Sequence, residues 1–212
     1  GVYILKCSAL LAVEWKGLNM PALICIDFIN DIVAPEGKLV GKGYALFCTQ
    51  HQVLEKARLA QDHFRQNNWP VMHVRVGFAK GYAAQPKRSP LFGKAHQFGA
   101  LELGTWGTEF AVTTAPQNDE LTFNKPRVSA FYGTSLEAAL SAQGIHEVYL
   151  CGVATDLAVE AAARDGHDRD YSVTVLADCC GAANDEDHQK SLTTLQKVAA
   201  VTTLSQLINK AA

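Results

Sequence analysis

The sequence predicts a single three-layer α/β domain in which helices flank one mainly parallel, doubly wound sheet. Two observations favour this fold class. Short apolar runs typical of fully buried strands alternate with segments whose apolar residues recur at helical spacing. No internal repeat, linker or change of composition divides the 212 residues, a length that suits one domain with a sizeable core.

Composition and charge argue against several classes of partner. Hydrophobic residues make up 48% of the chain, charged residues 19%, and the formal net charge is −2. Nothing in these values favours binding to nucleic acid or to an anionic membrane surface. The six cysteines are scattered without Cys-x-x-Cys spacing, which favours buried, reduced thiols in a cytoplasmic protein over a disulfide framework.

Residues 1–19 differ from the rest of the chain. Their apolar stretch Cys7–Val13 is shorter than the roughly 20 residues that span a bilayer. It also lacks the basic start and small-residue cleavage site of a secretory signal. Because Met20 directly precedes the first clear strand, we expect the domain to occupy residues 20–212. Residues 1–19 are then an N-terminal extension, which either packs on the domain or was added for expression.

Two buried strands are expected in the first half of the chain. The run Ala22–Phe28 is apolar apart from Asp27 near its carboxyl end, and Trp69–Val76 is the second such run. Between them, a Gly-, Pro- and Lys-rich loop covers 31–43, and helical spacing predicts a helix over 44–67. Asp27 therefore lies where open α/β sheets bind ligands. Because an unpaired buried charge is costly, we expect Asp27 to be functional or to cap the following loop.

The segment Gly77–Trp106 shows little periodicity. Long irregular segments inside compact domains are usually functional. We expect this one to cover a bound substrate, with a solvated surface loop as the alternative. Its aromatic residues are Phe78, Tyr82, Phe92, Phe98 and Trp106, and the basic residues singled out are Lys80, Lys87 and Arg88.

Strands and helices continue to alternate in the second half. Strands are expected over 119–124, 146–151, 172–177 and 199–203, and helices over 135–143 and 185–198.

The stretch Leu150–Asp165 joins a strand to a helix through a tight turn at Gly152. Thr155 or Asp156 is expected to cap the helix. The free backbone N–H groups and the positive end of the helix dipole at such a turn can stabilise developing negative charge. An ordinary strand-to-helix corner is the alternative interpretation.

Several segments, in this order and spacing, resemble the isochorismatase-like hydrolase superfamily, which includes nicotinamidases, ureidoacrylate and other amide hydrolases, and the isochorismatases. They are ALICIDF with FIND, KPRVSAFYGT, CGVATDLAVEAAARD, DRDYSVTVLADCCGA and the following Glu-Asp-His helix start, and they cover roughly residues 20–205. The resemblance implies a Rossmann-like fold, a small-molecule substrate, no cofactor, and a homo-oligomer, either a dimer or a tetramer.

The resemblance also implies a catalytic triad of Asp, Lys and Cys. The Asp matches Asp27 and the Lys matches Lys125, whereas Ala158 occupies the position of the nucleophilic cysteine. In the family the thiolate attacks a carbonyl, the Asp moves the proton to the leaving amine, and the Lys holds the Asp and favours the thiolate. Main-chain N–H groups of Ala154 and position 158 form the oxyanion hole, and the Val153–Ala154 peptide is often cis.

Alanine supplies no nucleophile, which leaves three explanations open. The first is an amide hydrolase whose cysteine was deliberately replaced to trap substrate, so that hydrolysis of a C–N bond is impaired in this chain. The second is an isochorismatase-type enzyme in which Asp27 protonates a vinyl ether and water attacks. The third is an inactive binding protein that kept the pocket. The residues around Ala158 follow the cysteine-bearing pattern, which favours the first explanation.

Substrate contacts and metal binding are less clearly marked. The basic and aromatic residues near the strand ends indicate a planar or anionic small molecule. Nicotinamidases of the family carry an Asp-x-His metal-binding set near the end of the second strand, and the sequence VRVGFAKGY lacks it. We therefore expect no bound metal, and we disfavour nicotinamide as the substrate. His73 and His188 are interpreted as structural. The candidate substrate-binding residues are Phe28, Arg75, Phe78, Trp106, Phe131, Tyr132 and Thr155.

Overall fold

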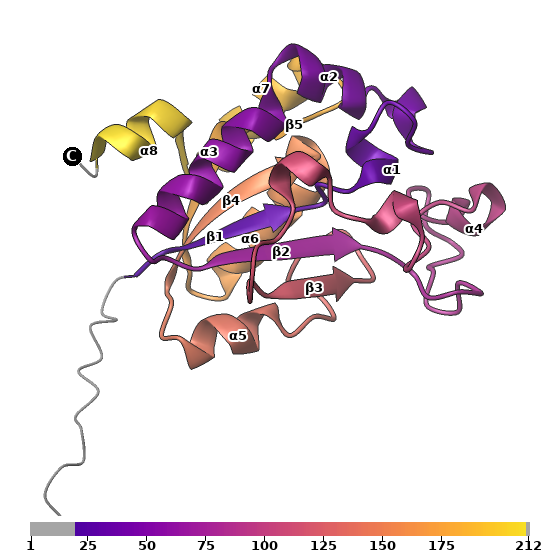
Figure 1. Cartoon of the computed structure of the whole chain (residues 1–212), viewed down its shortest axis with the longest axis horizontal. Helices are drawn as coiled ribbons and strands as arrows, with labels where there is room; N and C mark the ends of the chain where they lie inside the picture. Colours follow the sequence, from indigo (N-terminus) through magenta and orange to yellow (C-terminus); the bar gives the residue numbers. More distant parts are fainter. Residues whose placement is uncertain (1–19, 211–212) are drawn as a thin grey trace, which may run out of the picture.

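The structure, a computed structural model, describes residues 20–210, so the expectation for residues 1–19 lies outside the described residues. Six strands form one all-parallel sheet in the order β3-β2-β1-β4-β5-β6. Helices α3 and α8 lie on one side of this sheet, and α5 and α6 lie on the other (Figure 1). The predicted three-layer α/β fold is confirmed. No helix within residues 20–210 is both long and apolar enough to cross a membrane.

The bounds of the regular elements follow. The strands are β1 (Ala22–Ile26), β2 (Val71–Val76), β3 (Thr122–Lys125), β4 (Glu147–Val153), β5 (Ser172–Gly181) and β6 (Ala200–Thr202). The α-helices are α1 (Asn30–Val33), α2 (Tyr44–Gln50), α3 (Val53–Gln66), α4 (Ala95–Phe98), α5 (Leu136–Ala142), α6 (Glu160–Asp168), α7 (Asp185–Leu195) and α8 (Leu204–Lys210). Short 3₁₀ turns cover Val40–Lys42, Trp106–Thr108 and Val112–Thr114, and a π turn covers Thr155–Val159.

The central strands are the ones with continuous apolar sequences. All five residues of β1 are buried, because the sheet covers both of its edges and helices cover both of its faces. Strand β3, at one edge of the sheet, has two exposed residues and is far less apolar. The five cysteines within the described residues are buried and free, as expected, and Cys7 lies outside them.

Several elements differ from the prediction, and α8 was not expected at all. The helix expected over 44–67 is two helices, α2 and α3, because Gln52 adopts a left-handed conformation with φ of 53°. This break allows both Phe47 and Val53 to be buried. Strand β5 runs on to Gly181, where it pairs with Val153 beside the candidate site. The loop expected over 31–43 contains α1 and one 3₁₀ turn.

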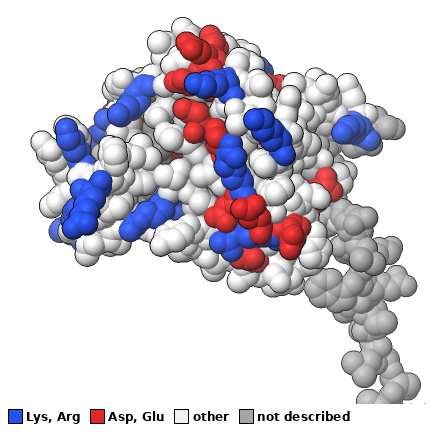
Figure 2. All heavy atoms as spheres, turned by 180° about the vertical axis from the view of Figure 1, so that it is seen from behind, with Lys and Arg blue, Asp and Glu red and all other residues white. Residues whose placement is uncertain are grey.

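Charge is unevenly distributed over the surface. Seen from behind, Lys and Arg side chains gather at the left end of the molecule, and Asp and Glu side chains gather over the middle of that face (Figure 2). This left end corresponds to the right end of Figure 1, which carries α4 and the long segment after β2.

Candidate active site

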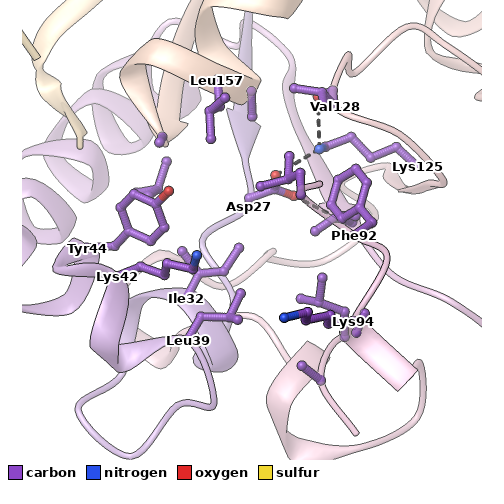
Figure 3. A pocket seen from close by; sticks show the side chains of 18 of the residues that line it. Asp27, Ile32, Leu39, Lys42, Tyr44, Phe92, Lys94, Lys125, Val128 and Leu157 are labelled. Atoms are coloured by element: carbon purple, nitrogen blue, oxygen red, sulfur yellow. Dashed lines mark hydrogen bonds and ion pairs between the residues drawn. The ribbon is translucent and has the colours of Figure 1, made fainter. Parts of the chain in front are cut away.

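A buried ion pair lies at the carboxyl edge of the sheet. Asp27 directly follows β1, and Lys125 is the last residue of β3. The Lys125 Nζ atom lies 2.8 Å from Asp27 Oδ2, and both side chains are almost fully buried. The backbone N–H of Val76, at the end of β2, donates to Asp27 Oδ1 at 2.6 Å. The ends of three adjacent parallel strands therefore position one carboxylate (Figure 3).

Opposing effects act on the Asp27 carboxyl. Burial raises its pKa above the ordinary value, and the charge of Lys125 and the Val76 N–H act in the opposite direction by stabilising the carboxylate. Lys125 also donates to the carbonyl oxygens of Arg127 at 3.1 Å and Val128 at 3.0 Å. With the bond to Asp27, the three N–H groups of its ammonium are all used, so the pair is held in one arrangement.

The second part of the site is the turn between β4 and α6. The Val153–Ala154 peptide is cis, and the N–H groups of Leu157 and Val159 both donate to the Ala154 carbonyl oxygen, at 3.2 and 3.1 Å. Neither the Ala154 N–H nor the Ala158 N–H donates to a backbone carbonyl of another described element. These are the two N–H groups that the motif assigns to an oxyanion hole.

The expected cap by Thr155 or Asp156 is wrong. Ala154 occupies the N-cap position, and no side chain accepts a hydrogen bond there. The Thr155 hydroxyl instead lies 2.7 Å from His188 Nδ1 on α7. Also on α7, Ser191 Oγ lies 3.2 Å from the Thr155 carbonyl oxygen. Burial lowers the pKa of His188, and its contact with the turn fits the structural role interpreted from the sequence.

Asp27, Lys125 and Ala158 line one cavity of about 170 Å³. Most of its walls are apolar, and they come from the chain after β1, the long segment after β2, and the turn before α6. The lining residues are Asp27, Ile32, Leu39, Lys42, Tyr44, Val76, Pro90, Leu91, Phe92, Lys94, Ala95, Phe98, Ala100, Leu101, Lys125, Val128, Val153, Ala154, Leu157 and Ala158.

None of the seven substrate-binding candidates lines this cavity. Four of them, Phe28, Phe78, Phe131 and Thr155, are buried in the packing around the site. Arg75 donates to the Asn124 side chain and to the Thr108 carbonyl. Trp106 and Tyr132 are about half exposed, with relative exposures of 49% and 58%.

The long segment after β2 contributes to the cavity through its middle. Residues 90–101 supply eight lining residues, whereas Phe78 and Trp106 at its ends supply none. Phe78 packs against Tyr82 and Phe92 and so supports the wall from behind. Sequence reasoning missed Lys42 and Lys94, although both lie in segments that the sequence marks as irregular and basic.

No group of three or more His, Cys, Asp or Glu side chains among residues 20–210 is placed to hold a metal ion. The polar groups at the floor of the cavity are one carboxylate, one ammonium and backbone N–H groups. This set can move a proton at Asp27 and stabilise negative charge beside position 158.

Comparisons with known proteins identify the family of the chain. The isochorismatase domain family model matches residues 21–206. The chain is 30% identical to the uncharacterized isochorismatase family protein YecD of Escherichia coli O157:H7, covering 76% of this chain and 84% of that protein. It is 32% identical to ureidoacrylate amidohydrolase RutB of Stutzerimonas stutzeri, covering 80% of this chain and 73% of that protein.

A solved structure supports the same assignment. The N-carbamoylsarcosine amidase of Thermoplasma acidophilum superposes with a TM-score of 0.70 at 26% identity, covering 88% of this chain and 97% of that one. The superfamily that the motifs resemble is therefore confirmed, and the chain belongs to the isochorismatase family of hydrolases.

Proposed function

We propose that this protein is built to hydrolyse a C–N, amide-type bond in a small molecule, and that Ala158 impairs this activity in the present chain. The observation that carries the proposal is the Asp27–Lys125 ion pair, which shares one cavity with Ala158 and the turn after β4. Relatives named as an amidohydrolase and an amidase support the reaction class.

Each group has a distinct role once a thiol occupies position 158. Asp27 accepts the thiol proton, and the thiolate attacks the carbonyl carbon. As the C–N bond breaks, Asp27 delivers that proton to the leaving nitrogen, and a water molecule then hydrolyses the thioester with Asp27 as the base. The positive charge of Lys125 keeps Asp27 ionised before the attack. The N–H groups of Ala154 and position 158 stabilise the oxyanion.

The test restores the nucleophile. Ala158→Cys and the present chain are assayed against a panel of small amides and ureido compounds, and the new thiol is titrated with iodoacetamide. We expect hydrolysis to rise by at least about a thousandfold in the Cys form, and to be lost again in Ala158→Cys with Asp27→Asn. A reactive thiol without hydrolysis of any amide would contradict the proposal.

A second candidate function uses Asp27 as an acid. Burial raises the pKa of Asp27, which favours the protonated carboxyl that cleavage of a vinyl ether requires, and this chemistry needs no thiol. If the present chain cleaves isochorismate, at a rate unchanged by Ala158→Cys and abolished by Asp27→Ala, this candidate replaces the first. Tight ligand binding without turnover in both forms would favour a binding protein.

We also propose that the protein works as a homo-oligomer, a dimer or a tetramer, in the cytoplasm. The five buried, free cysteines among residues 20–210 support a reducing compartment. Large exposed apolar side chains, among them Phe98, Trp106 and Tyr132, offer surface for self-association. Light scattering of the purified chain measures the oligomeric state. A monomer at micromolar concentration would contradict the proposed homo-oligomer.

A further inference from the structure

The cavity carries an excess of positive charge. Four of its lining residues are charged: Asp27, Lys42, Lys94 and Lys125. The Asp27 carboxylate is already paired with Lys125. Neither Lys42 nor Lys94 forms an ion pair with a carboxylate of residues 20–210. The cavity therefore holds two uncompensated ammonium groups in a chain whose net charge is −2.

These two lysines lie at the mouth of the cavity, and the ion pair lies at its floor. Lys42 ends the 3₁₀ turn before α2, and Lys94 precedes α4 in the long segment after β2. Both residues are exposed, whereas Asp27 and Lys125 are buried. In Figure 3 the nitrogen atoms of Lys42 and Lys94 point into the space between the walls, on the side away from Leu157 and Val128.

Apolar side chains line the cavity between its mouth and its floor. Ile32 and Leu39 form one wall, and Phe92 and Leu101 form part of another. Such walls give no polar partner to a ligand along most of its length and exclude water from its middle. The two ammonium groups at the rim remain exposed, so a charge–charge contact with them is weakened by salt.

We propose that Lys42 and Lys94 select a substrate with an apolar middle and an anionic group, such as a carboxylate, at the end remote from the bond that is cleaved. The identification of that bond rests on the proposed function; the charge preference does not. The reactive carbonyl lies over Asp27 and position 158, the apolar middle contacts Phe92 and Leu101, and the anionic end reaches the two ammonium groups. Lysine suits this task because its compact charge on a flexible stem tolerates anions of different length.

The surface around the cavity supports the proposal. The segment Gly77–Trp106 contains four Lys or Arg residues and one Glu. Figure 2 shows basic side chains gathered at the end of the molecule that carries this segment, away from the acidic side chains. A positive surface around a cleft attracts an anion at long range and raises its association rate, an effect that salt reduces.

The test measures binding in the present chain and so requires no catalysis. Two matched pairs serve as probes, the rigid terephthalamate with neutral terephthalamide, and the flexible adipamate with neutral adipamide. Members of a pair differ only in a carboxylate against a carboxamide. We expect at least one carboxylate to bind about tenfold more tightly than its neutral partner at low salt.

Substitutions identify the source of the preference. Lys42→Met with Lys94→Met keeps the aliphatic stems and removes both charges, and we expect it to abolish the preference. Lys80→Met is the matched control, because Lys80 is an exposed lysine of the same segment that does not line the cavity. Equal affinity for both members of both pairs would overturn the proposal, as would a preference that survives the double substitution.

Kinetics in the Ala158→Cys form separates this inference from the proposed function. If that form hydrolyses amides without regard to charge, the proposed function stands and this inference fails. If the present chain prefers the carboxylates and the Cys form hydrolyses nothing, the anion selectivity stands and the amide chemistry fails. If both hold, Lys42→Met with Lys94→Met should raise KM for the carboxylate substrate by about tenfold and leave kcat nearly unchanged.

Discussion

Lys125 is the one cation that contacts the Asp27 carboxylate among residues 20–210, and almost no water reaches either side chain. Removing one partner of such a pair leaves an uncompensated buried charge, whereas removing both leaves none. The coupling between the two substitutions therefore measures the pair itself, separately from the packing of either side chain.

We expect Lys125→Met to lower the free energy of unfolding by about 3 kcal/mol at neutral pH. The loss should shrink as the pH falls. Burial raises the pKa of Asp27 and the charge of Lys125 acts to lower it, so the folded variant without Lys125 takes up the proton at a higher pH than the folded wild type does. Asp27→Asn with Lys125→Met should lose less than the sum of the two single losses. Urea unfolding of the wild type, the two single variants and the double variant gives the coupling free energy. Purely additive losses would show that the two side chains do not stabilise each other.

Single residues differed in how far the sequence could identify them. Asp27 stands out because a carboxylate at the end of an apolar run has few structural explanations. Lys125 ends an unremarkable short strand, so its role came only from the family resemblance. Phe28 and Phe131 were expected to bind substrate, yet they are buried outside the cavity lining. A sequence shows that an aromatic side chain is near a strand end, and only the backbone direction decides which way it points.

At the scale of elements, the close contact between β1 and β4 depends on Gly152. This residue has a φ of 145°, and a Cβ atom there would overlap the Ile26 carbonyl oxygen. The approach of the two strands brings Asp27 next to the turn that carries Ala158. No residue with a side chain fits this position without moving one of the strands.

Gly152→Ala should destabilise the fold by about 3 kcal/mol, since it adds both an overlap with a backbone atom and an unfavourable φ. Gly41→Ala is the matched control, because its added methyl group meets no atom within 4 Å. Thermal unfolding of both variants measures the difference. Equal melting temperatures for the two variants would show that β1 and β4 can separate freely at this point.

Helix α7 supports the turn before α6 through Thr155. Thr155→Val removes the hydroxyl that pairs with His188 and should lower the free energy of unfolding by about 1–2 kcal/mol, because the ring nitrogen of His188 then stays buried without a partner. Thr194→Val is the control on α7 itself, where an exposed hydroxyl donates to the Lys190 carbonyl oxygen. Urea unfolding compares the two variants. A loss in Thr155→Val no larger than that in Thr194→Val would show that the Thr155–His188 contact does not stabilise the turn.

At the scale of the molecule, Glu120 joins three parts of the fold. Its carboxylate accepts from Arg65 on α3 at 2.7 and 3.0 Å and lies 2.8 Å from His73 on β2, while its own backbone leads into β3. Partial burial acts to raise the pKa of Glu120, but the hydrogen bonds to His73 and Arg65 outweigh it and lower the pKa to about 2. This contact lies at the amino end of the sheet, away from the candidate site.

Because the folded-state pKa of Glu120 lies below the ordinary 4.5, its contribution to stability is present above that pH and is lost as the pH falls toward about 2. Between these two pH values the free energy of unfolding of the wild type should fall by on the order of 1–2 kcal/mol because of Glu120, after allowance for solvent screening. We expect Glu120→Gln to remove this part of the fall. Unfolding measured across this pH range tests it, with the exposed Glu186→Gln as control. If the free energy of unfolding of Glu120→Gln depends on pH as that of the wild type does, the Glu120 carboxylate is not the source of this acid sensitivity.

The sequence by itself determined the fold class, because the strands that fill a buried parallel sheet must be apolar on both faces and therefore show as continuous runs. It also determined the order of the six strands and the family, through motifs whose residues are adjacent in sequence. Helices α1, α4 and α8 were not expected from the sequence. It could not determine the break at Gln52 between α2 and α3, since the helical spacing continues across it.

The tertiary structure alone decided the composition of the cavity. Lys42 and Lys94 are far apart in the chain and lie in irregular segments, where no periodicity indicates the direction of a side chain. They come together because the carboxyl ends of adjacent parallel strands meet at one edge of the sheet, and the loops that follow must share the space above it. The binding surface thus depends on contacts between segments that are distant in the sequence. The fold class depends on patterns of apolar residues that are close together in the sequence.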